Sequence, residues 1–512
     1  ELPIIALLHL FQGTVDVDAL AFMGSEGNDY ALPELQDKTK DQLTALLDRA
    51  TEAGLLTPLT PDASRITHHA LSIAGYYSIH PALPWYLRQL FEESYPAHAA
   101  PPATSAEGAL RAWVEAMAAL GNYYHNQYGA GNRGVITFLA LEEANLLHAR
   151  RSARRHGWWY GVAAAMQGLR VLYEEYQGRT AEWARLVAEI VPDYCTPAGD
   201  PLPGREGDYS LVMDYRVRLA QNVERDLPRA AALQEKRVVW NRRQAAAALA
   251  LPPSATLDAA QRNRIRALGV SVFTLGQILM EQDSPGCVAA YEETIQYSQR
   301  IGDTAAEAIA HFNLGHAYKD LLAIRDLDAA EAAYRRSLAL ENPNDALARL
   351  SDIQQIGMVH HERFNDARAR GEPAGALLRH AQAAQQHYQQ ALALCPPTAV
   401  KALSPIHNQL GVLYQNVGQI ELAREHYESD VQICEQTGDR YGAGQTRYNL
   451  ALMYRNAAGR EAAPARRRDL LQRALAYAQA SLRDFQHYQG RAADMEARAQ
   501  QLIDGITQAL GE

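Results

Sequence analysis

The feature that most constrains the fold is a short pattern that recurs along the second half of the chain. Leu314-Gly315-x-x-Tyr318 returns as Leu410-Gly411-x-x-Tyr414 and, more loosely, as Leu450-Ala451-x-x-Tyr454. Weaker copies begin at Leu275 and Ile356, so successive copies start 39, 42, 54 and 40 residues apart. A unit repeated at this period buries its apolar face by stacking on its neighbours, which predicts an extended array rather than one closed core.

A second pattern, Ala-x-x-x-aromatic-x-x-small, follows each copy. Its clearest examples are Ala330/Tyr334/Ser337, Ala384/Tyr388/Ala391 and Ala423/Tyr427/Asp430. Both patterns space their apolar residues three or four apart, as a helix requires, so each unit predicts a pair of helices. The small residue after the first leucine lets the second helix approach closely. The 54-residue step predicts an insertion around Arg363–Leu377.

These two motifs resemble the signatures of the tetratricopeptide repeat, over at least residues 268–507. The period is longer than the usual one and is similar to that of variants with extended helices. The resemblance implies a right-handed superhelix whose first helices line a concave groove. It assigns the following residues to that groove: Asn313, His316, Lys319, Gln355, His361, Asn408, Gln415, Asn449 and Arg455, with Gln354, Asn416, Tyr448 and Asn456 beside them.

Amides dominate this groove list. Asparagine and glutamine both donate and accept hydrogen bonds, so they can pair with an extended peptide backbone of any sequence. We therefore expect a protein or peptide ligand in the groove. Two alternatives stay open: a solvated groove without a ligand, and a ligand that uses residues 106–250 or a convex edge.

Residues 105–250 are expected to be degenerate members of the same array, because Leu169/Tyr173 are followed by Ala184/Ala188 and residues 210–223 by 228–245. An unrelated helical bundle is the alternative. Proline and alanine dominate 96–104, which predicts a linker. The clear array is expected from 251 to 512, after Pro252-Pro253.

The first 95 residues predict a different fold. Helices are expected at 2–11, 15–20, 39–53 and 81–93, and two paired strands at 55–59 and 76–79, joined by a loop that contains Pro61 and Asp62. Three helices, a two-stranded wing and a closing helix describe a winged-helix domain. The expected fold is therefore mainly α, with an N-terminal winged helix followed by a tetratricopeptide superhelix.

The order winged helix, Ile79-His80-Pro81, then a helical array resembles the C-terminal part of bacterial STAND-type signalling ATPases. In that family a histidine at the end of the winged helix touches the β-phosphate of ADP, and the resemblance gives this nucleotide-sensing role to His80 in the intact protein. Pro81 departs from the aspartate of the family motif, which puts any aspartate-dependent contact in doubt. The alternative is that His80 only caps the closing helix.

A phosphate-binding loop of the type GxxxxGK[ST] is absent from the sequence, which contains no Gly-Lys pair. Such a loop supplies the backbone amides and the lysine that hold nucleotide phosphates. We therefore expect this chain not to be an enzyme, to carry no cofactor, and to meet ATP or ADP through a nucleotide-binding domain in a missing upstream part. The chain is interpreted as a piece of a longer protein. The alternative is a stand-alone scaffold or adaptor for protein–protein interaction.

Charge argues against nucleic-acid or membrane partners. The chain carries a net charge of −10, and residues 1–104 hold 13 acidic residues against 5 basic ones. A DNA-reading face needs several lysines or arginines to neutralise phosphates, so a transcription regulator with a winged helix is kept only as an alternative. Four cysteines without a CxxC pair and no run of 18 apolar residues indicate a cytoplasmic protein.

Two histidine pairs suggest metal binding only at first sight. His360-His361-Glu362 lacks the four-residue spacing that puts two histidine ligands on one helical face. His360 also occupies the place of the repeat tyrosine, so a structural role is expected. His68-His69 has no carboxylate or cysteine at ligand spacing. No metal site is therefore expected.

Overall fold

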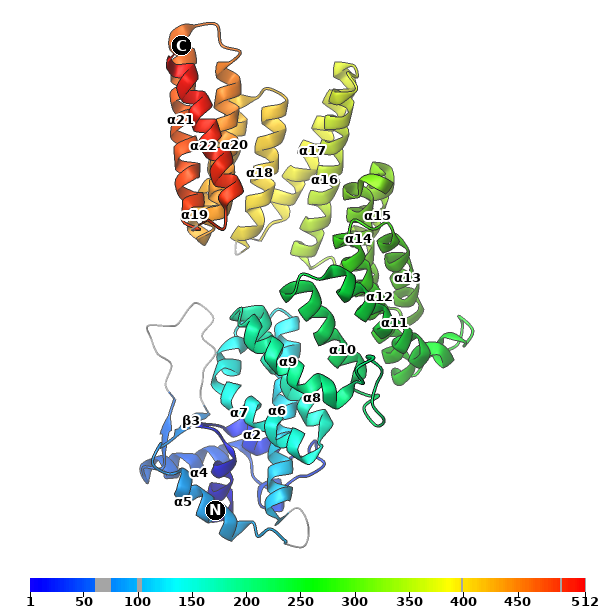
Figure 1. Ribbon diagram of the computed structural model, residues 1–512, viewed down its shortest axis with the longest axis vertical. Helices are drawn as coiled ribbons and strands as arrows, with labels where there is room; N and C mark the ends of the chain where they lie inside the picture. The colour runs from blue at the N-terminus through cyan, green and yellow to red at the C-terminus, as the bar shows by residue number, and fades with distance from the viewer. Residues whose placement is uncertain (60–74, 99–103, 397–398, 489, 512) are drawn as a thin grey trace. The chain divides into compact units, whose positions relative to one another are not determined.

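The computed structural model describes residues 1–59, 75–98, 104–396, 399–488 and 490–511 (Figure 1). Within these ranges the chain is mainly helical, with a three-stranded sheet near the N-terminus. The residue contacts group into two compact units, Glu1–Trp240 and Asn241–Glu512. The described residues on both sides of the predicted linker belong to the first unit. Residues 99–103 of that linker lie outside the described residues.

The first unit begins with short helices around a small antiparallel sheet. The helices are α1 (Leu2–Ala6), which continues as the 3₁₀ turn η1 (Leu7–Leu10), then α2 (Val17–Phe22), α3 (Pro33–Gln36), α4 (Lys40–Glu52) and α5 (Pro84–Ser94). The strands are β1 (Thr14–Asp16), β2 (Leu56–Pro58) and β3 (Tyr76–Ile79), in the order β1-β3-β2.

The predicted pairing of the last two strands is confirmed, since Leu56 lies opposite Ile79 and Pro58 opposite Tyr77. Strand β1 was not predicted. It pairs with the other edge of β3 in the stretch where the sequence suggested the start of a helix. The helix begins two residues later, because the Asp16 carboxylate accepts a hydrogen bond from the Asp18 amide (2.9 Å) as an N-cap. The expected loop with Pro61 and Asp62 and the pair His68-His69 lie outside the described residues.

Six further helices complete the first unit. They are α6 (Ala106–Gly129), α7 (Val135–His156), α8 (Trp159–Arg170) with the π-helical turn η3 (Val171–Tyr176), α9 (Thr180–Tyr194), α10 (Tyr209–Arg218) with the π-helical turn η4 (Leu219–Val223), and α11 (Leu227–Leu249), which continues into the second unit.

One hydrophobic core joins the first 95 residues to these helices. Phe11 packs edge-on against Trp113 of α6, with ring centroids 5.9 Å apart, and both rings are buried. The Gln12 amide donates to Asn145 of α7 (2.6 Å), and the buried Asn28 side chain donates to the Ala112 carbonyl (2.9 Å). The N-terminal segment and α6–α10 therefore form one packed body.

The second unit is a succession of helix pairs. Its helices are α12 (Ala259–Glu281), α13 (Gly286–Ile301), α14 (Thr304–Asp320), α15 (Leu327–Leu340), α16 (Ala346–Ala369), α17 (Ala374–Leu394), α18 (Val400–Asn416), α19 (Ile420–Thr437), α20 (Arg440–Ala458), α21 (Pro464–Gln486) and α22 (Ala493–Gly511), with the turn η5 (Leu322–Ile324) after α14. Each helix packs on the next, and α16, α18, α20 and α22 also contact one another in sequence (Figure 1).

The repeat glycines fix the register of this tetratricopeptide-like array. A Cβ atom at Gly411 would lie 2.6 Å from the ring of Tyr427 on the partner helix. The same close approach, at 2.7–2.8 Å, pairs the other repeat glycines with the second-helix tyrosines: Gly276 with Tyr291, Gly315 with Tyr334, and Gly357 with Tyr388. The glycine of the first pattern and the tyrosine of the second therefore contact each other within each helix pair, as the sequence predicted.

The predicted insertion lies within one helix pair. The extra residues of the 54-residue step lengthen a helix pair, since α16 has 24 residues and α17 has 21, and a short turn at Gly371 joins them. Alanine and arginine are the commonest residues of the predicted stretch 363–377, and these strong helix formers extend α16 up to the turn.

Candidate functional site

A cleft of about 530 Å³ opens beside α18, α20 and α22, the first helices of the last repeats and the terminal helix. Among its lining residues are Ser404 and Asn408 from α18, Asp430 from α19, Gln445, Thr446 and Asn449 from α20, and Met495 and Arg498 from α22. Polar side chains from four helices thus converge on one hollow.

Asp430 organises one wall of the cleft. Its buried carboxylate accepts hydrogen bonds from the hydroxyls of Ser404 (2.5 Å) and Thr446 (2.6 Å) and from the Asn408 amide (3.1 Å). Asn408 also donates to the Thr446 hydroxyl (2.8 Å). These bonds join α18, α19 and α20, so the wall is held in position before any ligand arrives.

Two residues of the predicted groove, Asn408 and Asn449, line this cleft together. They differ in how far their side chains are already hydrogen-bonded within the protein. The Asn408 amide nitrogen is committed to Asp430 and Thr446, whereas the partly exposed Asn449 side chain makes no hydrogen bond within the described part of the chain. Asn449 therefore offers both a donor and an acceptor to a ligand.

Lys319 and Gln355, predicted for neighbouring repeats, also meet. The Lys319 ammonium donates to the Gln355 side-chain oxygen (2.7 Å) and lies 3.6 Å from the Asp320 carboxylate. Lys319 is only 7% exposed, and burial lowers its pKa. The structure brings the two residues together as a contact between α14 and α16, not as free ligand-binding groups.

His361, like Lys319, is used in contacts between helices. Its Nε2 accepts from the Asn416 amide (3.1 Å), which leaves Nδ1–H to donate to the Tyr388 hydroxyl (3.5 Å). Burial, and then the charge of Arg368, lower the His361 pKa to about 4, so the ring is neutral at pH 7. It links α16 to α17 and α18.

The remaining groove residues are dispersed. Asn313 donates to the Ile309 carbonyl of its own helix (2.8 Å), and His316 packs against the Tyr334 ring and contacts Asp320. Gln415 accepts from the Tyr427 hydroxyl (3.0 Å) and lines a second cleft of about 560 Å³. Arg455 is exposed and its guanidinium donates to Asn456 (3.3 Å).

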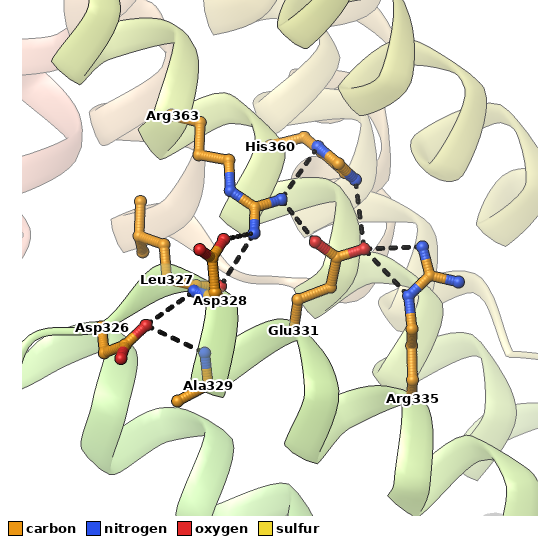
Figure 2. Close-up of polar contacts among 8 residues, drawn as sticks. All are labelled: Asp326, Leu327, Asp328, Ala329, Glu331, Arg335, His360 and Arg363. Atoms are coloured by element: carbon orange, nitrogen blue, oxygen red, sulfur yellow. Dashed lines mark hydrogen bonds and ion pairs between the residues drawn. The ribbon is translucent and has the colours of Figure 1, made fainter.

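An ionic cluster joins α15 to α16 (Figure 2). Glu331 accepts from Arg335 (2.9 Å to Nε) and from Arg363, and lies 3.6 Å from the His360 Nε2. The contact with His360, followed by those with Arg363 and Arg335, holds the pKa of Glu331 well below its ordinary value. Arg363 also donates to Asp328 (2.6 Å). His360, at the place of the repeat tyrosine, thus takes part in a contact between helices.

His80 lies at the end of β3, where its side chain is exposed. Its Nδ1 accepts from the Ala82 amide (3.3 Å), and its carbonyl accepts from the Leu83 amide (3.0 Å). The imidazole therefore supports the turn into α5 and remains open to solvent on its other side.

Sequence reasoning missed Asp430, Thr446 and Arg498 as parts of the cleft. The signal for Asp430 was present, because it stands where the second pattern has a small residue, and a carboxylate at a buried repeat position needs polar partners. Arg498 belongs to the terminal helix, which repeats no pattern.

The comparisons with known proteins give limited information. No family model matches the chain, and no curated protein matches it. Solved structures that match include the human IFIT1 dimer with m7Gppp-AAAA and the same dimer with PPP-AAAA, each at 14% identity over 77% of this chain and 95% of that one. Their TM-scores are 0.29 and 0.27. These values are too low to assign this chain a ligand.

Neither a membrane span nor a metal-binding cluster is found in the described part of the chain. None of its helices combines the length and apolar character needed to cross a bilayer. No group of three or more histidine, cysteine, aspartate or glutamate side chains lies there in positions that could hold a metal ion.

Proposed function

We propose that the second unit is a binding module that receives a protein or peptide segment in the cleft of α18, α20 and α22. The observation that carries the proposal is the pairing of a fixed polar wall, built on Asp430, with the uncommitted amide of Asn449 at the same hollow. Arg498 adds a cation to the lining of the same cleft. Several hydrogen bonds acting together supply the affinity, because each contributes only about 0.5–1.5 kcal/mol.

A displayed library of random linear peptides, selected against the full chain, tests this proposal. The double variant Asn449→Ala/Arg498→Ala should weaken a selected peptide at least tenfold. The matched control, Gln472→Ala/Arg467→Ala, removes an amide and a guanidinium from exposed positions of α21 and should leave affinity unchanged. If no peptide is recovered, or if both variants bind alike, the cleft is not the binding site.

A finer proposal concerns regulation. The first helix is followed by strand β1, the three helices α2–α4 and the paired strands β2 and β3, and this order supports a winged helix in residues 1–95. A winged helix followed by the exposed His80 supports the role of a regulatory module in a STAND-type ATPase. In that role this chain contacts the protein's own nucleotide-binding domain. A stand-alone cytoplasmic scaffold is the competing proposal. In both proposals the chain itself performs recognition, without catalysis and without a cofactor, nucleic acid or membrane.

The gene sequence upstream of Glu1 separates these two roles. The regulatory proposal requires a phosphate-binding loop within about 300 residues, a distance suited to one or two domains. In the resulting full-length protein, His80→Ala should speed the release of bound ADP, while Arg88→Ala nearby should not. An upstream sequence without such a loop would favour the scaffold.

A further inference from the structure

Five arginines line a cleft of about 490 Å³ between α7 and α9 of the first unit. Four come from the last two turns of α7 and one from α9: Arg150, Arg151, Arg154, Arg155 and Arg185. The other lining residues are Leu147, Leu186 and Glu189. The proposed peptide-binding function uses none of these residues.

Two of the arginines are neutralised by α9. Arg150 pairs with Glu189 (2.6 Å), and Arg154 pairs with Asp193 (2.5 Å). These pairs join the two helices and fix the floor of the cleft. Arg150 is 4% exposed, and its Nε and Nη1 atoms have no hydrogen-bond partner in the described part of the chain.

The other three, Arg151, Arg155 and Arg185, are exposed and form no ion pair with any described residue. The cleft therefore carries three uncompensated positive charges in a protein whose net charge is −10. The dipole of α7 favours cations at its C-terminal end. The dipole of α7 does not explain the presence of Arg185, because Arg185 belongs to α9 and lines the same cleft.

The positive field is also visible at a neighbouring side chain. His148 lies one turn before Arg151 and two turns before Arg155 on α7. Burial, and then the charges of these two arginines, lower the His148 pKa to about 4. The histidine is therefore neutral at pH 7 and adds no charge of its own to the cleft.

We propose that this cleft binds a chain of phosphate groups carried by a small ligand. Guanidinium groups present paired N–H donors that match phosphate oxygens, and three of them from two helices can contact successive phosphates. The cleft has the volume of a small-molecule site. An acidic peptide would need charges spread along an extended groove, whereas these arginines are concentrated at one hollow.

Calorimetric titration of the full chain tests the proposal, with sodium tripolyphosphate and ATP as separate probes. Both should bind, and more weakly at 300 mM than at 50 mM NaCl. The triple variant Arg151→Gln/Arg155→Gln/Arg185→Gln should lose at least tenfold in affinity for both. Tighter binding of ATP would identify a nucleotide tail as the source of the phosphates, and equal binding a free oligophosphate.

A matched control removes the same charge elsewhere. Arg264→Gln/Arg467→Gln/Arg468→Gln changes three exposed arginines of the second unit and should leave binding unchanged. If the cleft variant fails to fold, single changes at the exposed Arg151 and Arg155 replace it. Equal losses in both triple variants, no binding of either probe, or equally tight binding of hexaglutamate would overturn the proposal.

Discussion

Gly411 shows how much of the array depends on single residues. Leucine at this position would place its Cβ 2.6 Å from the Tyr427 ring, so Gly411→Leu should lower the free energy of unfolding by about 1–3 kcal/mol, as overpacking does. Urea denaturation measures the change. Gly375→Leu is the control, because Gly375 is exposed in α17 with no atom within 4 Å of its Cβ position. Equal stability of the two variants would mean that the repeat register is wrong.

Glu142 makes the first unit sensitive to pH. Its carboxyl group is buried, which raises its pKa to about 8, and one of its oxygens accepts from Asn145 (2.8 Å). The folded state therefore keeps a proton that the unfolded chain has lost above its ordinary pKa of 4.5. The protonated Glu142 thus makes a contribution to the free energy of unfolding that depends on pH. That contribution is complete below pH 4.5 and is lost as pH rises through about 8.

Glu142→Gln should remove this dependence. Glutamine keeps an acceptor for Asn145 but never becomes charged, so the variant should gain more than about 1 kcal/mol over the natural chain between pH 5 and pH 9. Urea denaturation at the two pH values measures this. Glu52→Gln, at an exposed position of α4, should show no such gain. A gain of the same size in both variants would place the pH dependence elsewhere.

At the scale of elements, the hydrogen bonds around Asp430 join three helices. Asn408→Ala removes two of them and should lower the free energy of unfolding by about 1–2 kcal/mol. Asn449→Ala should change it by less than about 0.5 kcal/mol, since Asn449 makes no bond with a described residue. Thermal and urea denaturation compare the two. The opposite order would assign the structural role to Asn449.

The helix pairs could be predicted because their signals are local. Leu410-Gly411 and Tyr427 lie within one hairpin, so the sequence pattern already contains the contact. Strand β1 could not be predicted in this way. Thr14 pairs with Ser78, and no sequence pattern near Thr14 indicates a partner 64 residues away. Repeat spacing alone could not show what form the extra residues of the 54-residue step take, since longer helices and an inserted segment give the same spacing.

The residues predicted for the groove show that site prediction is also limited to what the local repeat pattern contains. The structure brings Lys319 and Gln355 of neighbouring first helices into contact, and Asn408 and Asn449 line one cleft. They could not show which side chains satisfy each other. Lys319 is paired across the repeat boundary and Asn449 is not, and this difference arises from the three-dimensional packing.

At the scale of the whole molecule, the first unit should survive a break in its chain. A specific protease site introduced into 96–104 and then cut should give two fragments that elute together in native gel filtration. The shared core, with Phe11 against Trp113 and Gln12 bonded to Asn145, holds them together. They should separate in urea. Separate elution under native conditions would show that residues 1–95 fold independently.

The same core decides where this gene can exchange parts with its relatives. A recombination crossover within 96–104 would join two halves of a core that had been selected in different proteins, and every contact across it would have to be matched again. A crossover in the short stretch between α11 and α12, after Leu249 and before Ala259, would leave that core whole and exchange α12–α22 together, with few contacts to match again, such as the ion pair of Arg242 with Glu293. Exchange of recognition specificity is therefore expected to leave its breakpoints in that stretch.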